Sequence, residues 1–546
     1  MDFRSARFAE ARVPATLLAL TLAGTLAGCA VPTAEGSASP SGSPAAVRGP
    51  ENGVLALSSD DPAELALYAS QSLFGYSPVA VLAGVDDAAD RMTAAATGQA
   101  LAAPVLLRGG AIGDGPVSDE LDRLGAEAVV VVGDETAVAD AEAVAGDRDV
   151  VRFDPNAVSE AAEEAVESAA GARGGASVAV ARGAGAGGND GPVAALPEAG
   201  MIDTNQLGAL RAKIPDVADP DQLSEVMLLV DPAEGQEAAV GTARAAGAVP
   251  FVVPGGDPGA RKEAIDTIAA ADPLGVVAIG PGFDDEDRLA WQVEAARQQP
   301  AYPHGTQRLA GGTYVAGSFA VPADGAAESI AALAAAAAPG ILAAASSAGA
   351  MPVVSVTASV QSADAGADGD HAGQLPVESV SAAVKAFREA GAIVVLDIVP
   401  GNRPLAAQLD ALEPVLAKPG VGVALHPEFR LAGNGAAVEG QVTAAELQAA
   451  IDRVAGIVAE HRLPQTMVVV HQSAASSVTD RATLEPRPQV LTVFAAAGPG
   501  GGGATANNIW HDVTTDLPAQ AAAGWTGEPA TAPAAPLAPT LIALTD

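Results

Sequence analysis

Apolar runs alternate with Ala-rich amphipathic segments through the first half of the chain. Two passages, 79–107 and 226–253, share one order: an apolar run, an acidic turn, an Ala-rich helical stretch and a short apolar run entered by Pro104 or Pro250. Continuous apolar strands that alternate with helices are typical of a parallel sheet covered on both faces. The pattern predicts two doubly wound, three-layer α/β units, at 54–185 and 221–299, with a linker at 186–220.

The pattern changes at about residue 300, where shorter βα repeats begin. Helical stretches such as 380–390 and 444–462 separate a series of apolar, strand-like runs at 351–360, 391–401, 421–429, 466–473 and 489–498. About 250 residues of repeated βα units suit a (β/α)8 barrel. The predicted fold class is therefore α/β: two doubly wound three-layer units followed by a (β/α)8-barrel-like domain at 300–546.

The N-terminus has the layout of a secretory signal. Three arginines precede an apolar segment at 15–26 that is too short to span a membrane. Leu26-Ala27-Gly28-Cys29 resembles the lipobox of bacterial lipoproteins, in which the cysteine is diacylated and the preceding peptide is removed. The resemblance implies a signal peptide at 1–28, lipidation of Cys29 and a location on the outer face of the cytoplasmic membrane. The Pro/Ser/Gly-rich stretch 29–53 is then a flexible tether.

Composition limits the possible chemistry. Cys29 is the only cysteine, which excludes disulfides and thiolate metal sites. The 66 acidic residues against 28 basic ones give a net charge of −38, so a nucleic-acid partner is not expected. Aromatic residues make up only 3% of the chain, which is few for a sugar-binding cleft.

No cofactor or metal is expected. Gly183, Gly185 and Gly188 have a G-x-G-x-x-G spacing after an apolar run, but the following NDGPVAALPEAG contains two prolines and no helical period. A dinucleotide site requires a helix N-terminus directly after the glycines, so this stretch is interpreted as a linker. The sequence also contains no H-x-H or H-E-x-x-H metal-ligand spacing.

One motif in the first unit resembles a known family. Leu121, Leu124, Gly125 and Ala126, followed by the valine run and Asp134 at 129–134, are similar to the type-2 cell-wall-binding repeat of Gram-positive surface proteins. The resemblance covers 54–145 and, more weakly, 222–297. It implies a non-catalytic module whose partner is a cell-wall polymer, peptidoglycan or an attached glycan. The alternative is a generic doubly wound domain, because ordinary helix-to-strand turns have the same pattern.

Polar residues end several predicted barrel strands. Asp397, Glu428 and His471 follow apolar runs, and in a barrel such strand ends converge on one face. Asp397 and Glu428 are candidates for the carboxylate pair of a glycoside hydrolase, with His471 as a third catalytic candidate. Strand-end acids also cap helices or pair with arginine. The candidate ligand-binding residues are His304, His426, Arg430 and Trp525.

The strings LDIVPGNRP, GVALHPEFRL, LPQTMVVVHQ and YPHG resemble the C-terminal region found after wall-binding repeats in uncharacterised actinobacterial lipoproteins. In that pattern Asp is more common at the position of His426, Trp at that of Phe429 and Phe at that of Ser473. These departures remove an acid, a tryptophan and a phenylalanine from the expected cleft. They make an active hydrolase a weaker hypothesis for this chain than for similar sequences.

Three hypotheses remain open from the sequence. The first is a lipid-anchored envelope protein that binds cell-wall polymer, with the barrel as platform or ligand-binding module. The second is a glycosidase-like enzyme acting on envelope polysaccharide through Asp397 and Glu428. The third is a solute-binding lipoprotein, which requires a cleft between lobes at 79–135 and 226–282.

Overall fold

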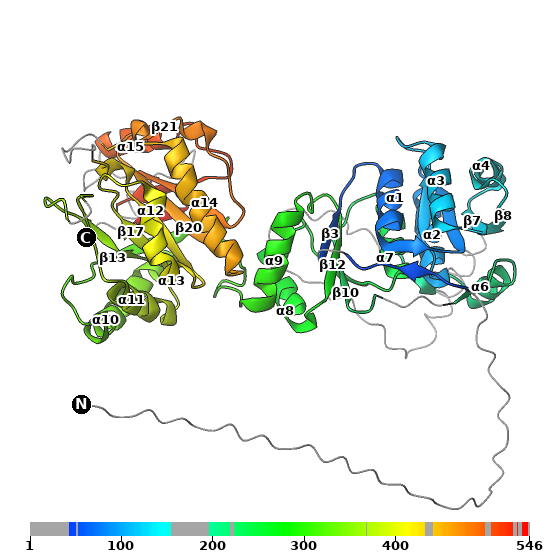
Figure 1. Cartoon of the computed structure of the whole chain (residues 1–546), viewed down its shortest axis with the longest axis horizontal. Coiled ribbons are helices and arrows are strands. Elements are labelled where there is room, and N and C mark those ends of the chain that lie inside the picture. The colour runs from blue at the N-terminus through cyan, green and yellow to red at the C-terminus, as the bar shows by residue number, and fades with distance from the viewer. Residues whose placement is uncertain are drawn as a thin grey trace, which may run out of the picture. The chain divides into compact units, whose positions relative to one another are not determined.

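The computed structural model describes residues 43–50, 53–153, 196–218, 223–366, 369–431, 440–496, 504–527, 532 and 538–543. Within these residues the larger sheets are two four-stranded parallel sheets and one closed, eight-stranded parallel barrel (Figure 1). The α/β class and the barrel are therefore confirmed. The signal peptide, Cys29 and the glycines at 183, 185 and 188 lie outside the described residues.

The first sheet has the order β6-β5-β7-β8, and its neighbouring strands are all parallel. Both faces are buried, because alternate residues of β7 belong to two different hydrophobic clusters. The elements are β5 (Val79–Gly84), α2 (Ala88–Leu101), β6 (Val105–Arg108), α3 (Asp114–Leu124), β7 (Ala128–Val132), α4 (Glu135–Ala145) and β8 (Asp149–Phe153).

Acidic residues in the turns after the apolar runs lie at the N-terminal ends of helices. Asp87 accepts hydrogen bonds from the second and third backbone N–H groups of α2, and Asp134 does the same for α4. Each aspartate satisfies N–H groups that the helix leaves free. Gly125 ends α3 with a φ of 65°, a left-handed conformation that favours glycine.

The second sheet has the order β11-β10-β12-β3 and is also parallel. Its edge strand β3 comes from the beginning of the first predicted unit, so the blue strand lies beside the green β12 in Figure 1. The predicted layout of two separate units is therefore not confirmed. The elements are β3 (Val54–Leu57), α1 (Pro62–Leu73), β10 (Val226–Val230), α7 (Glu237–Ala245), β11 (Val249–Val252), α8 (Lys262–Ala271), β12 (Gly275–Ile279) and α9 (Glu286–Gln298).

The two sheets share one hydrophobic core. Leu82 of β5, Leu57 of β3 and Leu228 of β10 belong to the same buried cluster, together with residues of α7. Continuous packing of this kind is how a single core is built. It disfavours a hinged cleft between 79–135 and 226–282, which the solute-binding hypothesis requires.

Short elements occur within the predicted tether and linker. The pairs are β1 (Ser43–Pro44) with β9 (Val217–Ala218), and β2 (Ala46–Val47) with β4 (Phe74–Tyr76). Helix α6 (Thr204–Arg211) and the 3-10 turn η1 (Ala199–Met201) lie within 186–220. The described parts of the tether and linker thus contain secondary structure of their own.

The barrel has the strand order β13-β14-β17-β18-β20-β22-β23-β24, and β24 pairs with β13 to close it. Alternate strand residues point inward and form a packed interior cluster, so the barrel is a core and not a pore. The strands are β13 (Tyr314–Phe319), β14 (Met351–Thr357), β17 (Ile393–Ile398), β18 (Val421–Leu425), β20 (Thr466–Gln472), β22 (Val490–Ala496), β23 (Ala522–Thr526) and β24 (Leu541–Ala543).

Helices cover the outside of the barrel. They are α10 (Ala327–Ser347), α11 (Val377–Glu389), α12 (Leu405–Leu409), α13 (Glu413–Leu416), α14 (Ala444–Glu460) and α15 (Ala504–Thr514). Two small strand pairs lie in the connections: β15 (Ser359–Gln361) with β16 (Ala372–Gln374), and β19 (Val442–Thr443) with β21 (Val478–Thr479). The β15–β16 pair follows β14 directly, so this pair lies at the face of the barrel where the carboxyl ends of the strands meet.

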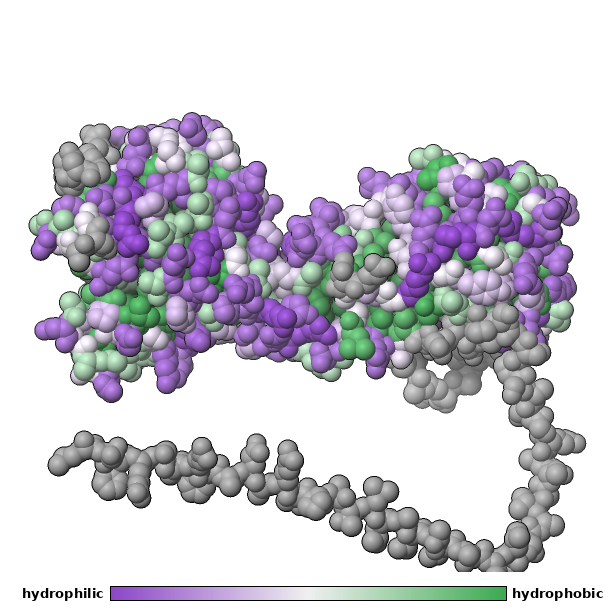
Figure 2. Space-filling view, in the orientation of Figure 1, coloured by the Kyte–Doolittle hydropathy of each residue, from purple (hydrophilic) through white to green (hydrophobic). Residues whose placement is uncertain are grey.

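Helix α10 is long and apolar enough to cross a membrane by length and composition alone. Four of its residues, Ile330, Ala334, Ala338 and Ala345, are buried in the cluster between the barrel strands and their helices. The helix is therefore part of the barrel wall. Figure 2 shows hydrophobic residues at the surface in the region of α10 and α11, where the two helices line an apolar groove of about 790 Å³.

Candidate functional site

Four neighbouring barrel strands end in inward-facing polar residues. Val353, Val395, Ala424 and Val469 belong to the interior cluster of the barrel. Because side chains alternate along a strand, the residues two positions further on face the same interior. Those residues are Ser355, Asp397, His426 and His471, at the carboxyl ends of β14, β17, β18 and β20.

His426 lies between two carboxylates. Its Nε2 is 3.0 Å from Asp397 Oδ1, and its Nδ1 is 2.8 Å from Glu428 Oε1. Its ring stacks on that of His471, with centroids 4.4 Å apart and planes 4° from parallel. These four residues and Ser355 form the group that we call the mouth cluster.

Glu428 reaches His426 from a 3-10 turn, η4 (Pro427–Phe429), that follows β18. The turn approaches Gly440 closely: a Cβ on Gly440 would lie 2.0 Å from the backbone carbonyl carbon of Glu428. Glu428 Oε2 is buried and has no hydrogen-bond partner among the residues that the structure describes. The carboxylate is therefore held in place while one of its oxygens stays unpaired.

Ser355 holds the other carboxylate. Its Oγ donates a hydrogen bond of 2.9 Å to Asp397 Oδ2. A serine nucleophile requires an imidazole that accepts its proton, whereas this hydroxyl donates to a carboxylate. Ser355 thus orients Asp397, and the geometry is not that of a Ser-His-Asp triad.

The electrostatics of the mouth cluster make His426 a cation. Burial lowers the pKa of His426, but the charges and hydrogen bonds of Asp397 and Glu428 outweigh burial and raise it to about 10. Burial raises the pKa of Asp397, and the charge of His426, with the hydrogen bond from Ser355, brings it below its ordinary value. At neutral pH the cluster therefore contains an imidazolium beside the ionised Asp397.

His471 has the opposite protonation. Burial and the positive charge of His426 lower the pKa of His471 to about 3, against a smaller effect of Asp397 in the other direction. The two stacked rings are therefore one charged and one neutral imidazole at pH 7. Two like charges at this ring separation would repel each other strongly, which explains the asymmetry.

The structure brings some of the predicted site residues together and leaves others apart. Asp397, Glu428, His426 and His471 form the mouth cluster. His304 is exposed, lies before the first barrel strand and is within 3.1 Å of the Arg308 carbonyl oxygen. It therefore lies on the side of β13 opposite to the polar strand ends.

Arg430 and Trp525 are also directed away from the mouth cluster. Arg430 donates hydrogen bonds to Glu446 and to the Arg403 carbonyl oxygen. Trp525 is only 2% exposed and packs edge-to-face on Trp510, with ring centroids 5.9 Å apart, in the layer outside the barrel. Neither side chain contributes to the polar face of the barrel interior.

The arginines that lie near these acids in the sequence pair elsewhere. Arg403 lies 3.5 Å from Asp370, and Arg430 pairs with Glu446. Asp397 and Glu428 both contact an imidazole, that of His426, and not a guanidinium. Sequence proximity of an arginine to an acid was therefore a poor guide to pairing.

Two residues of this region were not singled out as site residues from the sequence. Ser355 lies inside an apolar strand, and only the pairing of β14 with β17 places it beside Asp397. Phe429 is 42% exposed and stacks on His426, with centroids 5.4 Å apart and planes 23° from parallel. The alternation of side chains along β14 is the signal by which Ser355 could have been found.

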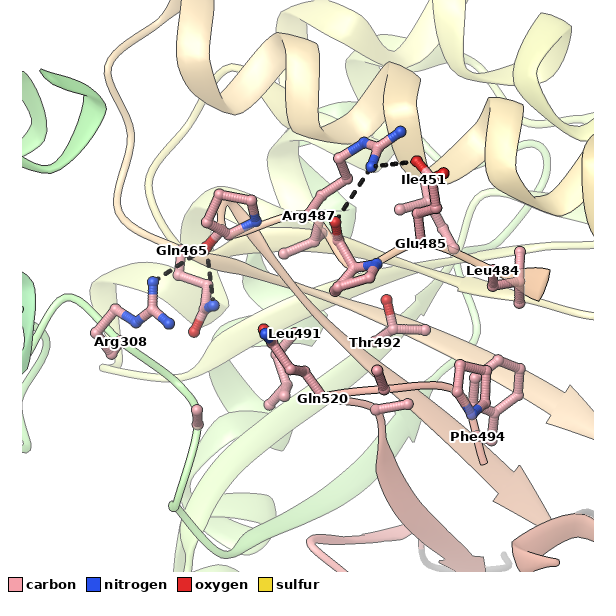
Figure 3. A pocket seen from close by; sticks show the side chains of 17 residues that line it. Arg308, Ile451, Gln465, Leu484, Glu485, Arg487, Leu491, Thr492, Phe494 and Gln520 are labelled. Atoms are coloured by element: carbon pink, nitrogen blue, oxygen red, sulfur yellow. Dashed lines mark hydrogen bonds and ion pairs between the residues drawn. The ribbon is translucent and has the colours of Figure 1, made fainter. Parts of the chain in front are cut away.

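A hollow of about 250 Å³ lies elsewhere on the barrel, on the outer side of β22 (Figure 3). The connection 473–489 contains only the 3-10 turns η5 (Ala475–Ser477) and η6 (Arg481–Thr483) and the short β21, so no α-helix lies between β20 and β22 in the chain. Arg308 and Gln465 both donate to the Pro488 carbonyl oxygen, at 3.2 and 3.0 Å. These two side chains therefore already donate to the protein backbone. The hollow does not include any residue of the mouth cluster.

One group in the described part of the chain has side chains close enough to hold a metal ion: Glu413, Glu460 and His461. Arg453 already pairs with Glu413 at 2.5 Å, and the group lies at the helical surface of the barrel. An exposed acidic group of this kind does not by itself define a metal site.

No protein-family model and no curated protein sequence matches the chain. Two solved structures of Clostridium difficile cell wall proteins are similar in part. Cwp6 is 14% identical with a TM-score of 0.29, and the match covers 63% of this chain and 62% of Cwp6. Cwp8 is 14% identical with a TM-score of 0.18, and the match covers 74% of this chain and 52% of Cwp8. Similarity at this level gives no information on activity.

Proposed function

We propose that this chain is a lipid-anchored cell-envelope protein that binds a cell-wall polymer, with the mouth of its barrel as a ligand-binding site. The observation that carries the proposal is the mouth cluster. Its polar residues lie at the ends of four consecutive strands of a packed barrel and in the turn after β18, at the face where ligand sites of this architecture are found. A rigid frame of this kind holds polar groups ready for a ligand.

The burial of these groups supports a functional role. The side chains of His426 and Glu428 are only 13% and 9% exposed. Taking paired charges out of water is costly, and well-packed apolar residues are often as stabilising at such positions. Ionisable groups with strongly shifted pKa values at the mouth of a barrel are therefore candidates for ligand contact.

The envelope location rests on the N-terminal sequence and on the repeat. Cys29 in its Leu-Ala-Gly-Cys context supports lipid anchoring. The motif around Leu121–Asp134 supports wall affinity, with peptidoglycan or an attached glycan as the partner. An anchored protein with a short tether meets that polymer at the membrane surface.

A glycosidase-like activity is less well supported by the geometry. Glycoside hydrolysis needs one carboxyl group that stays protonated and a second that is free to act as base or nucleophile. Here the pKa of Asp397 is lowered, because the charge of His426 outweighs burial. Both Asp397 and Glu428 contact the same imidazolium, so neither carboxyl group is free to act as proton donor, base or nucleophile.

Co-sedimentation with purified cell-wall sacculi tests the proposal. The chain from Ala30 onward keeps the whole compact unit from Gly42 to Asp546. We expect it to pellet with the walls without releasing reducing sugar, and Asp397→Asn to reduce pelleting. Asp410→Asn, which removes an equal charge at a surface pair with Arg453, is the control and should pellet like the wild type. Release of sugar that Asp397→Asn abolishes would instead establish the hydrolase.

A further inference from the structure

We infer that the mouth cluster selects a cationic saccharide, an amino sugar with a free primary ammonium group, over its neutral N-acetylated form. The inference deepens the proposed function and rests on it. It follows from the charges inside the cluster, from an unpaired carboxylate oxygen and from an aromatic ring at the rim.

The cluster places two carboxyl groups against a single imidazolium. Asp397 and Glu428 share the imidazolium of His426, and His471 is neutral. The positive charge that lowers the pKa of Asp397 most is that of His426. A buried or half-buried negative charge without a counterion favours a ligand that brings a positive one.

The neighbouring cationic side chains of the described residues are used elsewhere. Arg403 and Arg430 pair with Asp370 and Glu446. Arg481 donates to the Gln472 side chain and to the Thr515 carbonyl oxygen, and its guanidinium lies 5.3 Å from the Phe494 ring centroid. These side chains therefore supply no second positive charge to the two carboxyl groups.

The unpaired oxygen points to the same conclusion. Glu428 is more than nine-tenths buried, its Oε1 contacts His426, and its Oε2 has no partner among the described residues. A buried acceptor without a donor is costly in a protein that has evolved for stability alone. This oxygen therefore marks a position where the ligand supplies a hydrogen-bond donor, or where a donor of the protein moves into reach when the ligand binds.

Access to the cluster is through Asp397 and Phe429. The Asp397 side chain is 29% exposed, which makes it the carboxylate that solvent reaches most easily. Phe429 is partly exposed and stacks on His426. An ammonium group beside Asp397 would form a charge-assisted hydrogen bond, while the apolar face of the sugar ring packs on Phe429.

Two defined oligosaccharides test the inference. Chitosan tetramers carry free amines, and the matching N-acetylated tetramers are neutral. By titration calorimetry at 0.15 M salt, we expect the chain from Ala30 onward to bind the amine form at least about 10-fold more tightly. The N-acetylated form binding equally well or better would overturn the inference.

The net charge of −38 makes a matched control necessary, because any polycation is attracted to this chain. Asp397→Asn and Asp410→Asn each remove one negative charge, but only the first lies in the mouth cluster. We expect Asp397→Asn to abolish the preference and Asp410→Asn to retain it. A preference that survives in both variants would show nonspecific attraction and contradict the inference.

Phe429→Ala removes an exposed ring, so it should weaken binding of both tetramers. Its circular dichroism spectrum should match that of the wild type, which shows that the fold is kept.

Two further results separate this inference from the proposed function. If the wild type pellets with sacculi and Asp397→Asn reduces pelleting, but neither tetramer is preferred, the wall-binding proposal stands and the ammonium inference fails. If neither sacculi nor tetramers bind, both fail.

Discussion

At the scale of single residues, the mouth cluster depends on one imidazole ring. His426 contacts carboxylates with both of its nitrogens, at 3.0 and 2.8 Å, and stacks on a second histidine. Removing it would leave two acids facing each other with no counterion. The ring is therefore both the structural centre of the cluster and the source of its charge.

This arrangement predicts a stability that falls at alkaline pH. The pKa of His426 in the folded chain, about 10, lies above its ordinary 6.5, so its contribution is complete below pH 6.5 and is lost as the pH rises toward 10. Over this range each pH unit costs up to about 1.4 kcal/mol. Urea unfolding at pH 7 and pH 9, followed by fluorescence, should show a loss of about 1 to 3 kcal/mol.

His426→Gln and His304→Gln are the comparison variants. His426→Gln should be less stable at pH 7 and should lose less between pH 7 and pH 9, because the titrating group is gone. His304 is exposed and outside the cluster, so its variant should follow the wild type. Equal pH dependence of all three chains would show that His426 is not held as a cation.

The candidate site was partly predictable at this scale. Asp397, Glu428 and His471 stand at the ends of apolar runs, and the barrel prediction alone implied that they meet. The position of His426 between the acids depends on strand register, which pairs Asp397 with Ala424 and thereby sets His426 beside it. No spacing rule within one strand contains that information, and the catalytic and ligand-binding roles remain predictions.

At the scale of elements, helices α2 and α7 join the two four-stranded sheets. A Cβ on Gly241 would lie 2.7 Å from Ala95 Cα, so the helices cross almost backbone to backbone. Arg91 and Glu237 form a buried ion pair of 3.0 Å across this contact. Such close packing fixes the two sheets against each other.

Gly241→Ala tests this contact. Its new methyl group overlaps Ala95, so we expect a loss of about 1 to 3 kcal/mol in spite of the better helix propensity of alanine. Gly208 in α6 has no heavy atom within 4 Å of such a Cβ, and Gly208→Ala should be neutral or stabilising by up to about 1 kcal/mol. Equal thermal stability of the two variants would contradict the packed interface.

Local structure was more predictable than topology for these elements. The acidic turns before α2 and α4, the glycine that ends α3 and the buried valine strand β7 all follow from residue chemistry. The same residues make up most of the wall-binding-like motif, so each also has a structural role. The pairing of β3 with β12 was not predictable, because the apolar pattern of a parallel strand does not specify its neighbour.

At the scale of the whole molecule, the proposed function combines a lipid anchor at the N-terminus with a barrel that binds wall polymer. The folded unit begins near Gly42 and carries a strongly acidic surface charge. An acidic protein is steered toward cationic groups, which agrees with the inferred ligand.

Anchoring itself is tested by Cys29→Ser in cells. The variant lacks the thiol that is proposed to receive the lipid, so we expect the chain to leave the membrane fraction. Fractionation followed by immunoblotting measures the change, and Ser37→Ala in the same tether is the control. Retention of Cys29→Ser on the membrane would refute lipid anchoring.

The most direct test of the central claim is histidine NMR of the chain from Ala30 onward, titrated with soluble fragments of cell-wall glycan. We predict that the imidazole signals of His426 and His471 shift with increasing fragment concentration while those of His304 and His511 stay in place. His426 should also remain protonated at pH 8. Saturable binding that leaves the signals of His426 and His471 unmoved would contradict the assignment of the barrel mouth as the ligand site.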